Sequence, residues 1–318
     1  MSLPSLGTTY HRTSYPAISP SQPALSQAGR TILITGGGGG IGFEIARSFA
    51  KASASRVIIV GRRAAFLNEA VSNLQQEFGA KGVTEFIARQ GDIGDDASIS
   101  SLWEYLHSQG IFVNVLVLNA AFFGPNGAET LLLDKDEIMQ AFQVNVGGNF
   151  LMTTKFVHQT LRPSIPAADH QLYLINVSTA QIHTYPTSGS LNTYGTSKAA
   201  WMAMLGRIAD QSKVDELQII SYHPGALYSE GASRYVPKDL LNWDDMSLPA
   251  DYAVWAASSE ASWLHGRFVW AHWDVDELRA AATDVTNEVG KQMKDEEGYL
   301  KIGVLGLPSV SLKSLMKE

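Results

Sequence analysis

The sequence predicts an α/β fold: one doubly wound parallel sheet with helices on both faces, in three layers. Short runs of β-branched and aliphatic residues, typical of strands buried on both faces, alternate with segments whose apolar residues recur at helical spacing. Glycines or small polar residues follow these runs. Strands that alternate with helices in this way form parallel strand–helix–strand units.

Composition narrows the class of protein. The 318 residues fit one large α/β domain or two small ones, and the hydrophobic share of 45% is typical of a globular protein with a large core. The net charge of −7 and the lack of a basic cluster argue against nucleic acid or a membrane surface as a partner. No apolar run approaches the about 20 residues of a membrane span. The sequence has no cysteine, which excludes disulfides and thiolate catalysis and agrees with a reducing compartment, the cytoplasm.

Residues 1–29 differ from the rest of the chain. They carry four prolines among many serines and threonines, and no acidic residue. We expect an extended arm that lies on the domain surface. The alternative is a transit peptide, which would be an amphipathic and arginine-rich helix. The segment has one arginine, Arg12, which argues against this alternative.

The first predicted strand ends in a run of glycines. Residues 31–42 read T-I-L-I-T-G-G-G-G-G-I-G, and apolar residues at helical spacing follow. Glycines here let phosphates approach the backbone, and the free N–H groups of the helix start attract them. A flexible linker would have polar spacers, and a nucleoside-triphosphate loop would have Lys and Ser or Thr after its last glycine. The turn therefore predicts dinucleotide binding by Gly36, Gly38, Gly40, Ile41 and Gly42.

The second predicted strand, residues 56–60, ends in Gly61-Arg62-Arg63. In nucleotide-binding units an acidic residue at this place takes the ribose 2′-hydroxyl, whereas arginine takes a 2′-phosphate. Cations at a helix start are unfavourable unless an anion binds, so Arg62 and Arg63 as mere surface residues are the weaker interpretation. The sequence thus favours NADP(H) over NAD(H).

The next two predicted strands, residues 84–88 and 113–118, also end in polar residues. Asp92 and Ile93 follow the first, and Asp92 either hydrogen-bonds the adenine ring or organises the turn. Asn119 and Ala120 follow the second. Ligands of parallel sheets bind at the carboxyl ends of the strands, where these residues join the glycine turn.

A long helix is predicted over 134–161, with Asn145 inside it. Asparagine is mildly unfavourable in a helix interior because its amide competes for backbone partners. Its neighbours Val144, Val146 and Phe150 are apolar. We therefore expect a buried polar role for Asn145 rather than a solvent-facing one.

Candidate catalytic residues follow the fifth predicted strand, residues 172–177. Ser178 and Thr179 stand at its carboxyl end, and a helix beginning near Leu191 carries Tyr194 and, one turn later, Lys198. Residues four apart share a helix face, so we expect the lysine cation to lower the pKa of the phenol and suit it to general acid–base work. A hydroxyl from Ser178 or Thr179 would hydrogen-bond the reacting oxygen.

These motifs resemble the short-chain dehydrogenase/reductase family over about residues 30–270. The matching motifs, in family order and spacing, are Thr35-Gly36-x-x-x-Gly40-Ile41-Gly42, Asn119-Ala120-Ala121, Asn145, Tyr194-x-x-x-Lys198 and, after a strand at 217–222, His223-Pro224-Gly225. The stretch 268–278 and the proline-rich arm are similar to a fungal, NADP-dependent branch, many members of which act in secondary metabolism. The resemblance implies a Rossmann-type catalytic domain at 30–275, between the arm at 1–29 and a C-terminal helix and tail at 276–318.

The resemblance also implies residue roles. Tyr194 would be the general acid–base, Lys198 would bind the nicotinamide ribose, and Asn145 would hold a water molecule of a proton relay. The loop after strand 217–222 would bind the cofactor through Pro224, Gly225, Leu227 and Ser229. Two departures stand out: Ala121 replaces a glycine, and Thr179 occupies the usual serine position, with a longer loop before Tyr194. Thr179 is favoured over Ser178 as the hydroxyl donor.

The segment 226–246 corresponds to a substrate lid in the family. Tyr228 and Trp243 are candidate substrate contacts there, although such aromatics often only pack. Further candidates elsewhere in the chain are Phe122, Gln181 and Tyr185. No metal site is expected, since His183 has no second ligand at a suitable spacing. Beyond the lid we expect a helix at 250–260, a strand at 267–270, a charged helix at 276–294 and an apolar tail at 302–315.

The expected function is that of an oxidoreductase. It would transfer a hydride between NADP(H) and a ketone or secondary alcohol of a medium-sized, apolar substrate such as a secondary metabolite. The alternatives are a non-redox cyclase, isomerase or dehydratase on the same fold, and a cofactor-binding protein without catalysis. By family analogy, the helices that contain Asn145 and Tyr194 would form a homodimer or homotetramer.

Overall fold

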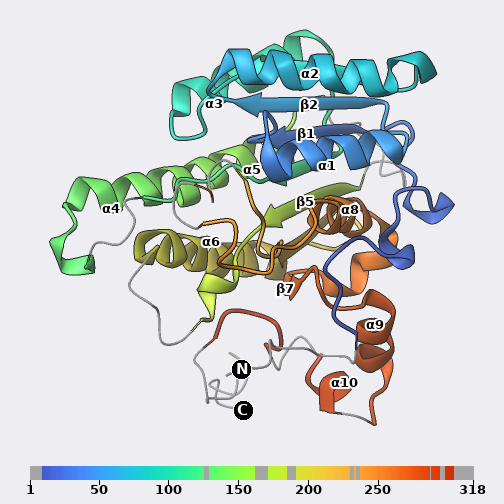
Figure 1. Cartoon of the computed structure of the whole chain (residues 1–318), viewed down its shortest axis with the longest axis vertical. Coiled ribbons are helices and arrows are strands. Elements are labelled where there is room, and N and C mark those ends of the chain that lie inside the picture. Colours follow the sequence, from blue (N-terminus) through green and yellow to red (C-terminus); the bar gives the residue numbers. More distant parts are fainter. Residues whose placement is uncertain are drawn as a thin grey trace.

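The central sheet is parallel throughout, and its strand order β3-β2-β1-β4-β5-β6-β7 confirms the predicted doubly wound fold (Figure 1). The computed structural model describes residues 9–124, 129–161, 171–184, 191–229, 233, 237–286, 288–293 and 298–303. The strands are β1 (Thr31–Thr35), β2 (Arg56–Gly61), β3 (Glu85–Gln90), β4 (Val115–Leu118), β5 (Leu172–Val177), β6 (Leu217–His223) and β7 (Arg267–Trp270). Because the chain runs outward from β1 to β3 and returns to β4, the strand order reverses between β1 and β4, where ligands bind in such folds.

Helices cover both faces of the sheet. Those described are α1 (Gly40–Lys51), α2 (Ala64–Phe78), α3 (Asp96–Ser108), α4 (Lys135–Phe142), α5 (Asn149–Val157), α6 (Asn192–Asp210), α8 (Ser247–Ala256), α9 (Val275–Thr283) and α10 (Glu288–Gln292). None of the described helices is long and apolar enough to cross a membrane. Side chains set several helix starts: Asp95 accepts from the Ala97 N–H before α3, and Asp274 accepts from the Glu277 N–H before α9.

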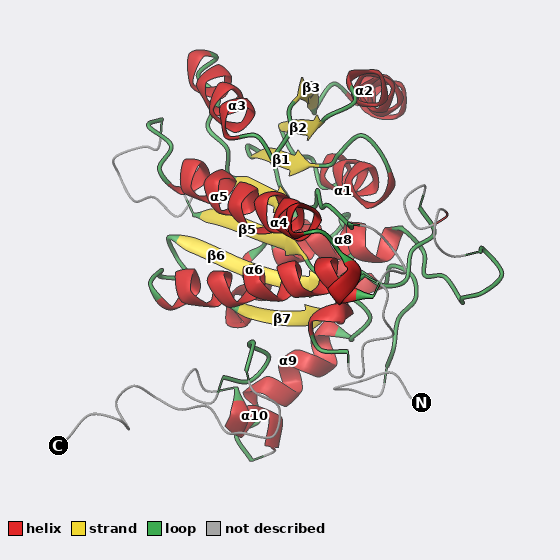
Figure 2. Ribbon diagram, turned by 90° about the vertical axis from the view of Figure 1, so that its left-hand side faces the viewer, coloured by secondary structure: helices red, strands yellow, loops and turns green. Residues whose placement is uncertain are grey.

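Alternate strand residues pack into two hydrophobic cores. In β1, Ile32 and Ile34 join the core under α1, α2 and α8, while Leu33 joins the core under α3, α5 and α6 (Figure 2). Both faces of the sheet are thus buried, which explains why its strands are unbroken apolar runs in the sequence.

The N-terminal arm differs from the expected surface segment. Its described residues, 9–29, contain two 3₁₀ turns, Pro16–Ile18 and Pro23–Leu25, and the side chains of Tyr15, Ile18 and Leu25 are buried in the core. Figure 1 shows the dark-blue arm running beside α8 and α9. The physical reason is apolar burial: this stretch supplies side chains that complete the core on the α8 side.

Two predicted helices are interrupted. The segment predicted as one helix over 134–161 is α4, a π-helical turn at Gln143–Gly148, and α5. The charged helix predicted at 276–294 is divided into α9 and α10, because Asp284 adopts an extended conformation with ψ 93°. Most of the predicted C-terminal tail, from residue 304 onward, lies outside the described residues.

Candidate active site

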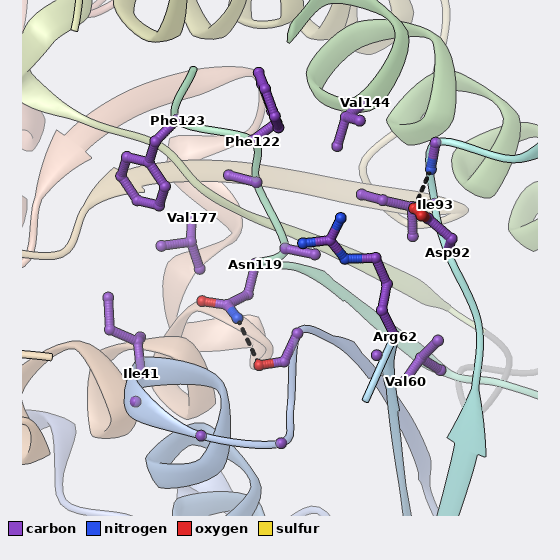
Figure 3. Close-up of a pocket in the computed structure, with 18 of the residues that line it drawn as sticks. Ile41, Val60, Arg62, Asp92, Ile93, Asn119, Phe122, Phe123, Val144 and Val177 are labelled. Carbon is purple, nitrogen blue, oxygen red and sulfur yellow. Dashed lines mark hydrogen bonds between the residues drawn. The ribbon is translucent and has the colours of Figure 1, made fainter. Parts of the chain in front are cut away.

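A cavity of about 580 Å³ lies at the carboxyl ends of the strands (Figure 3). Its walls bring together sixteen of the predicted site residues, which come from every part of the sheet edge: Gly36, Gly38, Gly40, Ile41, Arg62, Arg63, Asp92, Ile93, Asn119, Ala120, Phe122, Ser178, Tyr194, Lys198, Pro224 and Ser229. Eight others lie outside the wall: Gly42, Asn145, Thr179, Gln181, Gly225, Leu227, Tyr228 and Trp243. Tyr185 lies outside the described residues.

The glycine turn is shaped by close backbone packing. Gly36 has φ +71°, in the left-handed region that favours glycine. A Cβ on Gly42 would lie 2.3 Å from the Gly36 carbonyl oxygen and 2.7 Å from Asn119 Nδ2. Gly42 therefore lets α1 start directly against the turn, whereas Gly38 and Gly40 line the cavity itself.

Asn119 and Thr35 join the glycine turn to the end of β4. Asn119 Nδ2 donates to the Thr35 carbonyl at 2.9 Å and to the Gly36 carbonyl at 3.3 Å. In return, Thr35 Oγ1 accepts from the N–H groups of Asn119 and Ala120 at 3.0 and 3.1 Å. This reciprocal network holds the ends of β1 and β4 at a fixed spacing, so this part of the cavity wall is preformed.

Two arginine side chains follow the end of β2. The Arg62 side chain extends into the cavity in Figure 3. Arg63 also lines it, and its guanidinium lies 3.6 Å from the centroid of the Phe66 ring. Asp92 borders the same end, and its Oδ1 accepts from the Gly94 N–H at 2.8 Å. Asp92 therefore does organise its turn, one of the two roles predicted for it.

At the opposite end, Tyr194 and Lys198 project from α6. The Thr179 side chain hydrogen-bonds the Tyr194 hydroxyl, and its Oγ1 also accepts from the Gln181 N–H at 3.2 Å. Ser178 lines the cavity, but its buried hydroxyl has no hydrogen-bond partner among the described residues. The neighbour of the phenol is thus the Thr179 hydroxyl rather than that of Ser178.

The ionisation of this pair differs from the sequence-based expectation. Burial raises the pKa of Tyr194 above its ordinary value, and the hydrogen bond from Thr179 only partly offsets this. Burial also lowers the pKa of Lys198 to about 8. Lys198 Nζ donates to the Val177 carbonyl at 2.7 Å and lies 5.9 Å from the centroid of the Tyr194 ring. The expected lowering of the tyrosine pKa by Lys198 was wrong for this geometry, because burial raises that pKa and is its largest influence.

Asn145 is fully buried in the π-helical turn, as its apolar neighbours indicated. Its amide pairs with the backbone of Phe122 through both Oδ1 and Nδ2, each at 2.8 Å. Nδ2 also donates to Ser197 Oγ at 2.9 Å, and that hydroxyl donates to the Tyr194 carbonyl at 3.0 Å. Asn145 therefore ties the turn after β4 to the helix that carries Tyr194.

His223 links the end of β6 to the hydroxyl-bearing loop. Its Nδ1 accepts from the Ala180 N–H at 3.2 Å, next to Thr179. Burial, followed by the charge of His272, lowers the pKa of His223 to about 3, so the ring is neutral at physiological pH and Nδ1 can act as the acceptor.

The predicted lid aromatics pack on each other. Tyr228 and Trp243 meet edge to face with ring centroids 5.1 Å apart, and Trp243 Nε1 donates to the Lys238 carbonyl. Neither ring reaches the cavity wall. Among the described residues of 226–246, these two rings stabilise the segment itself, which is the alternative that their composition left open.

Sequence reasoning missed several wall residues. Val60, Phe66, Gln143, Val144 and Val177 also line the cavity. They carry no motif, and helical or strand periodicity identifies them only as apolar or surface positions. Their position beside the predicted residues at strand ends was the one available signal.

The reversal of strand order at β1 and β4, with a glycine turn at that point, defines a Rossmann-type nucleotide-binding fold. The model of the short chain dehydrogenase family matches residues 30–239. The chain belongs to this family, which confirms the resemblance seen in the sequence.

Fungal relatives are similar over most of the chain. Short chain dehydrogenase/reductase nsrO from Aspergillus novofumigatus is 36% identical over 275 residues, which cover 85% of this chain and 89% of that protein. Short chain dehydrogenase/reductase AacuD from Aspergillus aculeatus is 32% identical over 297 residues, covering 93% and 95%.

Solved structures share the fold. A short chain dehydrogenase/reductase family protein superposes with a TM-score of 0.64 at 25% identity, covering 77% of this chain and 97% of its own. The Pseudomonas aeruginosa RhlG/NADP active-site complex has a TM-score of 0.69 at 23% identity, covering 78% and 97%.

Proposed function

We propose that this oxidoreductase transfers a hydride between NADP(H) and a ketone or secondary alcohol of a medium-sized, mostly apolar substrate. The observation that carries the proposal is the arrangement of Thr179, Tyr194 and Lys198 at one end of a cavity whose other end is the glycine turn and Arg62. A proton donor and an anion-binding turn thus line a single cavity.

The residues present fit a bound dinucleotide. Gly38 and Gly40 keep side chains out of the cavity next to the N-terminus of α1, where pyrophosphate binds favourably. Gly61 occupies the position at which an acidic residue would bind the ribose 2′-hydroxyl. Next to it, Arg62 and Arg63 supply cations for a 2′-phosphate. The description of RhlG as an NADP complex agrees with this preference in a protein of the same fold. NADPH, when bound, supplies the hydride.

The chain's own residues would handle the proton. The Tyr194 phenol is protonated at neutral pH and can donate to a carbonyl oxygen as negative charge develops on it, while the pKa that burial raises makes it a weaker acid than an exposed tyrosine. Thr179 would hold the same oxygen and orient the phenol. Lys198 would place its cation beside the nicotinamide ribose, and Asn145 fixes the helix that carries Tyr194.

Further parts of the proposal concern setting and assembly. The fungal sources of the relatives support a substrate from fungal secondary metabolism, and the absence of cysteine supports the cytoplasm. Exposed apolar side chains on α4, α5 and α6, namely Met139, Phe150 and Met204, support a homodimer or homotetramer through these helices. Light scattering of Phe150→Glu beside the wild type would test the assembly.

The central experiment is a titration with NADPH and NADH, followed by tryptophan fluorescence, and then a screen of ketones. We expect tight NADPH binding, weak NADH binding and turnover that disappears in Tyr194→Phe while NADPH binding remains. Full turnover in Tyr194→Phe would refute the role of Tyr194. Product formed without oxidation of NADPH would instead indicate the non-redox chemistry.

A further inference from the structure

One buried carboxylate joins three segments that are distant in the sequence. The Asp244 side chain is 3% exposed. Its Oδ2 accepts from the Ala226 N–H at 2.8 Å and lies 2.8 Å from His272 Nε2. Its Oδ1 accepts from Arg12 Nη1 at 3.1 Å. The N-terminal arm, the loop after β6 and the segment after β7 therefore meet at Asp244.

Asp244 supports a turn that borders the cavity. Its own N–H donates to the Ala226 carbonyl at 2.8 Å, so the two residues are bonded in both directions. Gly225 has φ +109°, and a Cβ there would lie 2.8 Å from Asp244 Oδ2. The glycine thus lets the turn rest directly on the carboxylate. On either side of this contact, Pro224 and Ser229 line the cavity wall.

The carboxylate depends on its cationic and donor partners. Burial alone would raise the pKa of Asp244, but hydrogen bonds from His272 and Ala226 and the charge of Arg12 outweigh it and hold the pKa below its usual value. Arg12 Nη1 also donates to the Asn242 carbonyl at 2.8 Å. Arg12 therefore clamps both the side chain of Asp244 and the backbone just before it.

The rest of the arm has further anchors. Beside the carboxylate, the ring of Tyr10 stacks on that of His272 with centroids 4.5 Å apart, and the His11 N–H donates to the His272 carbonyl at 2.8 Å. Three side-chain contacts hold the arm away from Asp244. Thr9 bonds Glu277, His11 lies 2.8 Å from Asp274, and the Ser14 hydroxyl donates to Asp251 on α8 at 2.5 Å. These three contacts involve neither Asp244 nor the turn at 224–229, so the link from Arg12 to the cavity can be tested apart from them.

We infer that Arg12, acting through Asp244, is a positioning residue for the nicotinamide half of the cavity. The inference rests on the proposed function, which places the nicotinamide beside Lys198. Because β6 lies next to β5 and far from β2 in the sheet, the turn at 224–229 follows the strand end nearest Ser178 rather than Arg62. Arg12 does not line the cavity. It fixes the position of the turn at the end of β6, because it holds the carboxylate that accepts from the Ala226 N–H.

The test compares two ligands by isothermal titration calorimetry of the full chain. NADPH spans the whole cavity, whereas adenosine 2′,5′-bisphosphate has no nicotinamide half. Arg12→Ala and Asp244→Asn should weaken NADPH binding about tenfold, because each removes a charged hydrogen-bond partner, and should leave the bisphosphate unchanged. Arg12→Lys should restore part of the loss. Ser14→Ala, which frees the arm from Asp251, should bind both ligands as the wild type does.

Two results would overturn the inference. Equal weakening of both ligands in Arg12→Ala would mean that Arg12 supports only overall stability. Unchanged NADPH binding in Arg12→Ala would mean that the turn holds its position without the arm. Because Arg12 is 41% exposed, its variant folds even where Asp244→Asn does not. A wild type that binds neither ligand would refute the proposed function itself, and so differs from both results.

Discussion

The ring of Phe123 stacks on the ring of Tyr194, with centroids 4.6 Å apart and an interplanar angle of 19°. This contact joins the turn after β4 to α6. Because a stacked neighbour restricts rotation of the phenol ring, Phe123 helps to fix the direction of the hydroxyl. Phe123 also remains 42% exposed, so part of its ring can meet an apolar substrate.

Replacing Phe123 with Ala should therefore raise KM for a ketone that the wild type reduces and lower kcat. An aromatic pair contributes about 0.5–1.5 kcal/mol beyond area burial, so kcat/KM should fall by about 2- to 12-fold. Steady-state kinetics measures both constants. Phe66→Ala, at the Arg63 end of the cavity, is the matched control and should alter KM for NADPH only. Unaltered ketone kinetics in Phe123→Ala would show that the stack has no catalytic role.

Thr179→Val should lower kcat by about 10²- to 10³-fold, because it removes the hydroxyl that bonds Tyr194 and keeps the β-branched shape. Thr179→Ser should retain most of the activity. Ser178→Ala should have a much smaller effect, since the Ser178 hydroxyl has no partner among the described residues. Single-turnover kinetics separates this effect from product release. The reverse order of severity would assign the role to Ser178.

Arg62→Ala and Arg63→Ala should each weaken NADPH binding by about 10- to 100-fold without affecting NADH, because each removes a charge-assisted contact to a phosphate. Gly61→Asp should further move the preference towards NADH. A Cβ on Gly61 would be nearest to the Leu67 side chain, with Cδ2 at 3.4 Å in ordinary van der Waals contact, so the substitution fits. Fluorescence titration with both cofactors measures this preference, and an equal loss for the two would contradict 2′-phosphate binding.

Lys198→Met should abolish turnover but stabilise the fold near neutral pH. The lysine pKa falls from 10.5 to about 8 on burial, so below pH 8 the folded protein carries the charge at a cost. After allowing for the lost bond to Val177, the variant should gain about 2 kcal/mol. Between pH 8 and 10.5 the folded lysine releases its proton while the unfolded one keeps it, so wild-type stability rises and the difference narrows.

Urea denaturation of Lys198→Met at pH 7 and pH 9.5 measures that difference. Lys213→Met is the control, because the Lys213 side chain is 79% exposed and stays in contact with solvent in the folded protein. A stability gap of the same size at both pH values would show that Lys198 is not desolvated.

Much of the fold could be predicted because both faces of the sheet are buried, so its strands consist of consecutive apolar residues such as Ile32-Leu33-Ile34. The π-helical turn left no such trace. It arises where a Cβ on Gly148 would lie 1.9 Å from the Ile93 carbonyl oxygen, and where the Asn145 amide bonds Phe122. Both are contacts between distant segments, and local periodicity cannot report them.

Site residues such as Asn119 and Arg62 could be predicted because each directly follows a predicted strand, where ligands of parallel sheets bind. The pKa of Tyr194 could not be predicted from the sequence. Spacing placed Lys198 one turn away, but the degree of burial and the carbonyl of Val177 that takes the ammonium are tertiary facts. The arm was misread for the same reason, since its acidic partners lie more than 200 residues away.

The buried arm belongs to the folded core although the family model does not include it. The family model begins at residue 30, yet Ile18, Leu25 and Gln27 are buried before that point, and Gln27 Nε2 donates to the Ala257 carbonyl at 3.2 Å. The folded unit therefore begins before the segment that the family model matches, and the similarity to AacuD, which covers 93% of this chain, also extends into the arm. A fragment that starts at residue 30 would expose the hydrophobic underside of α8 and invite aggregation.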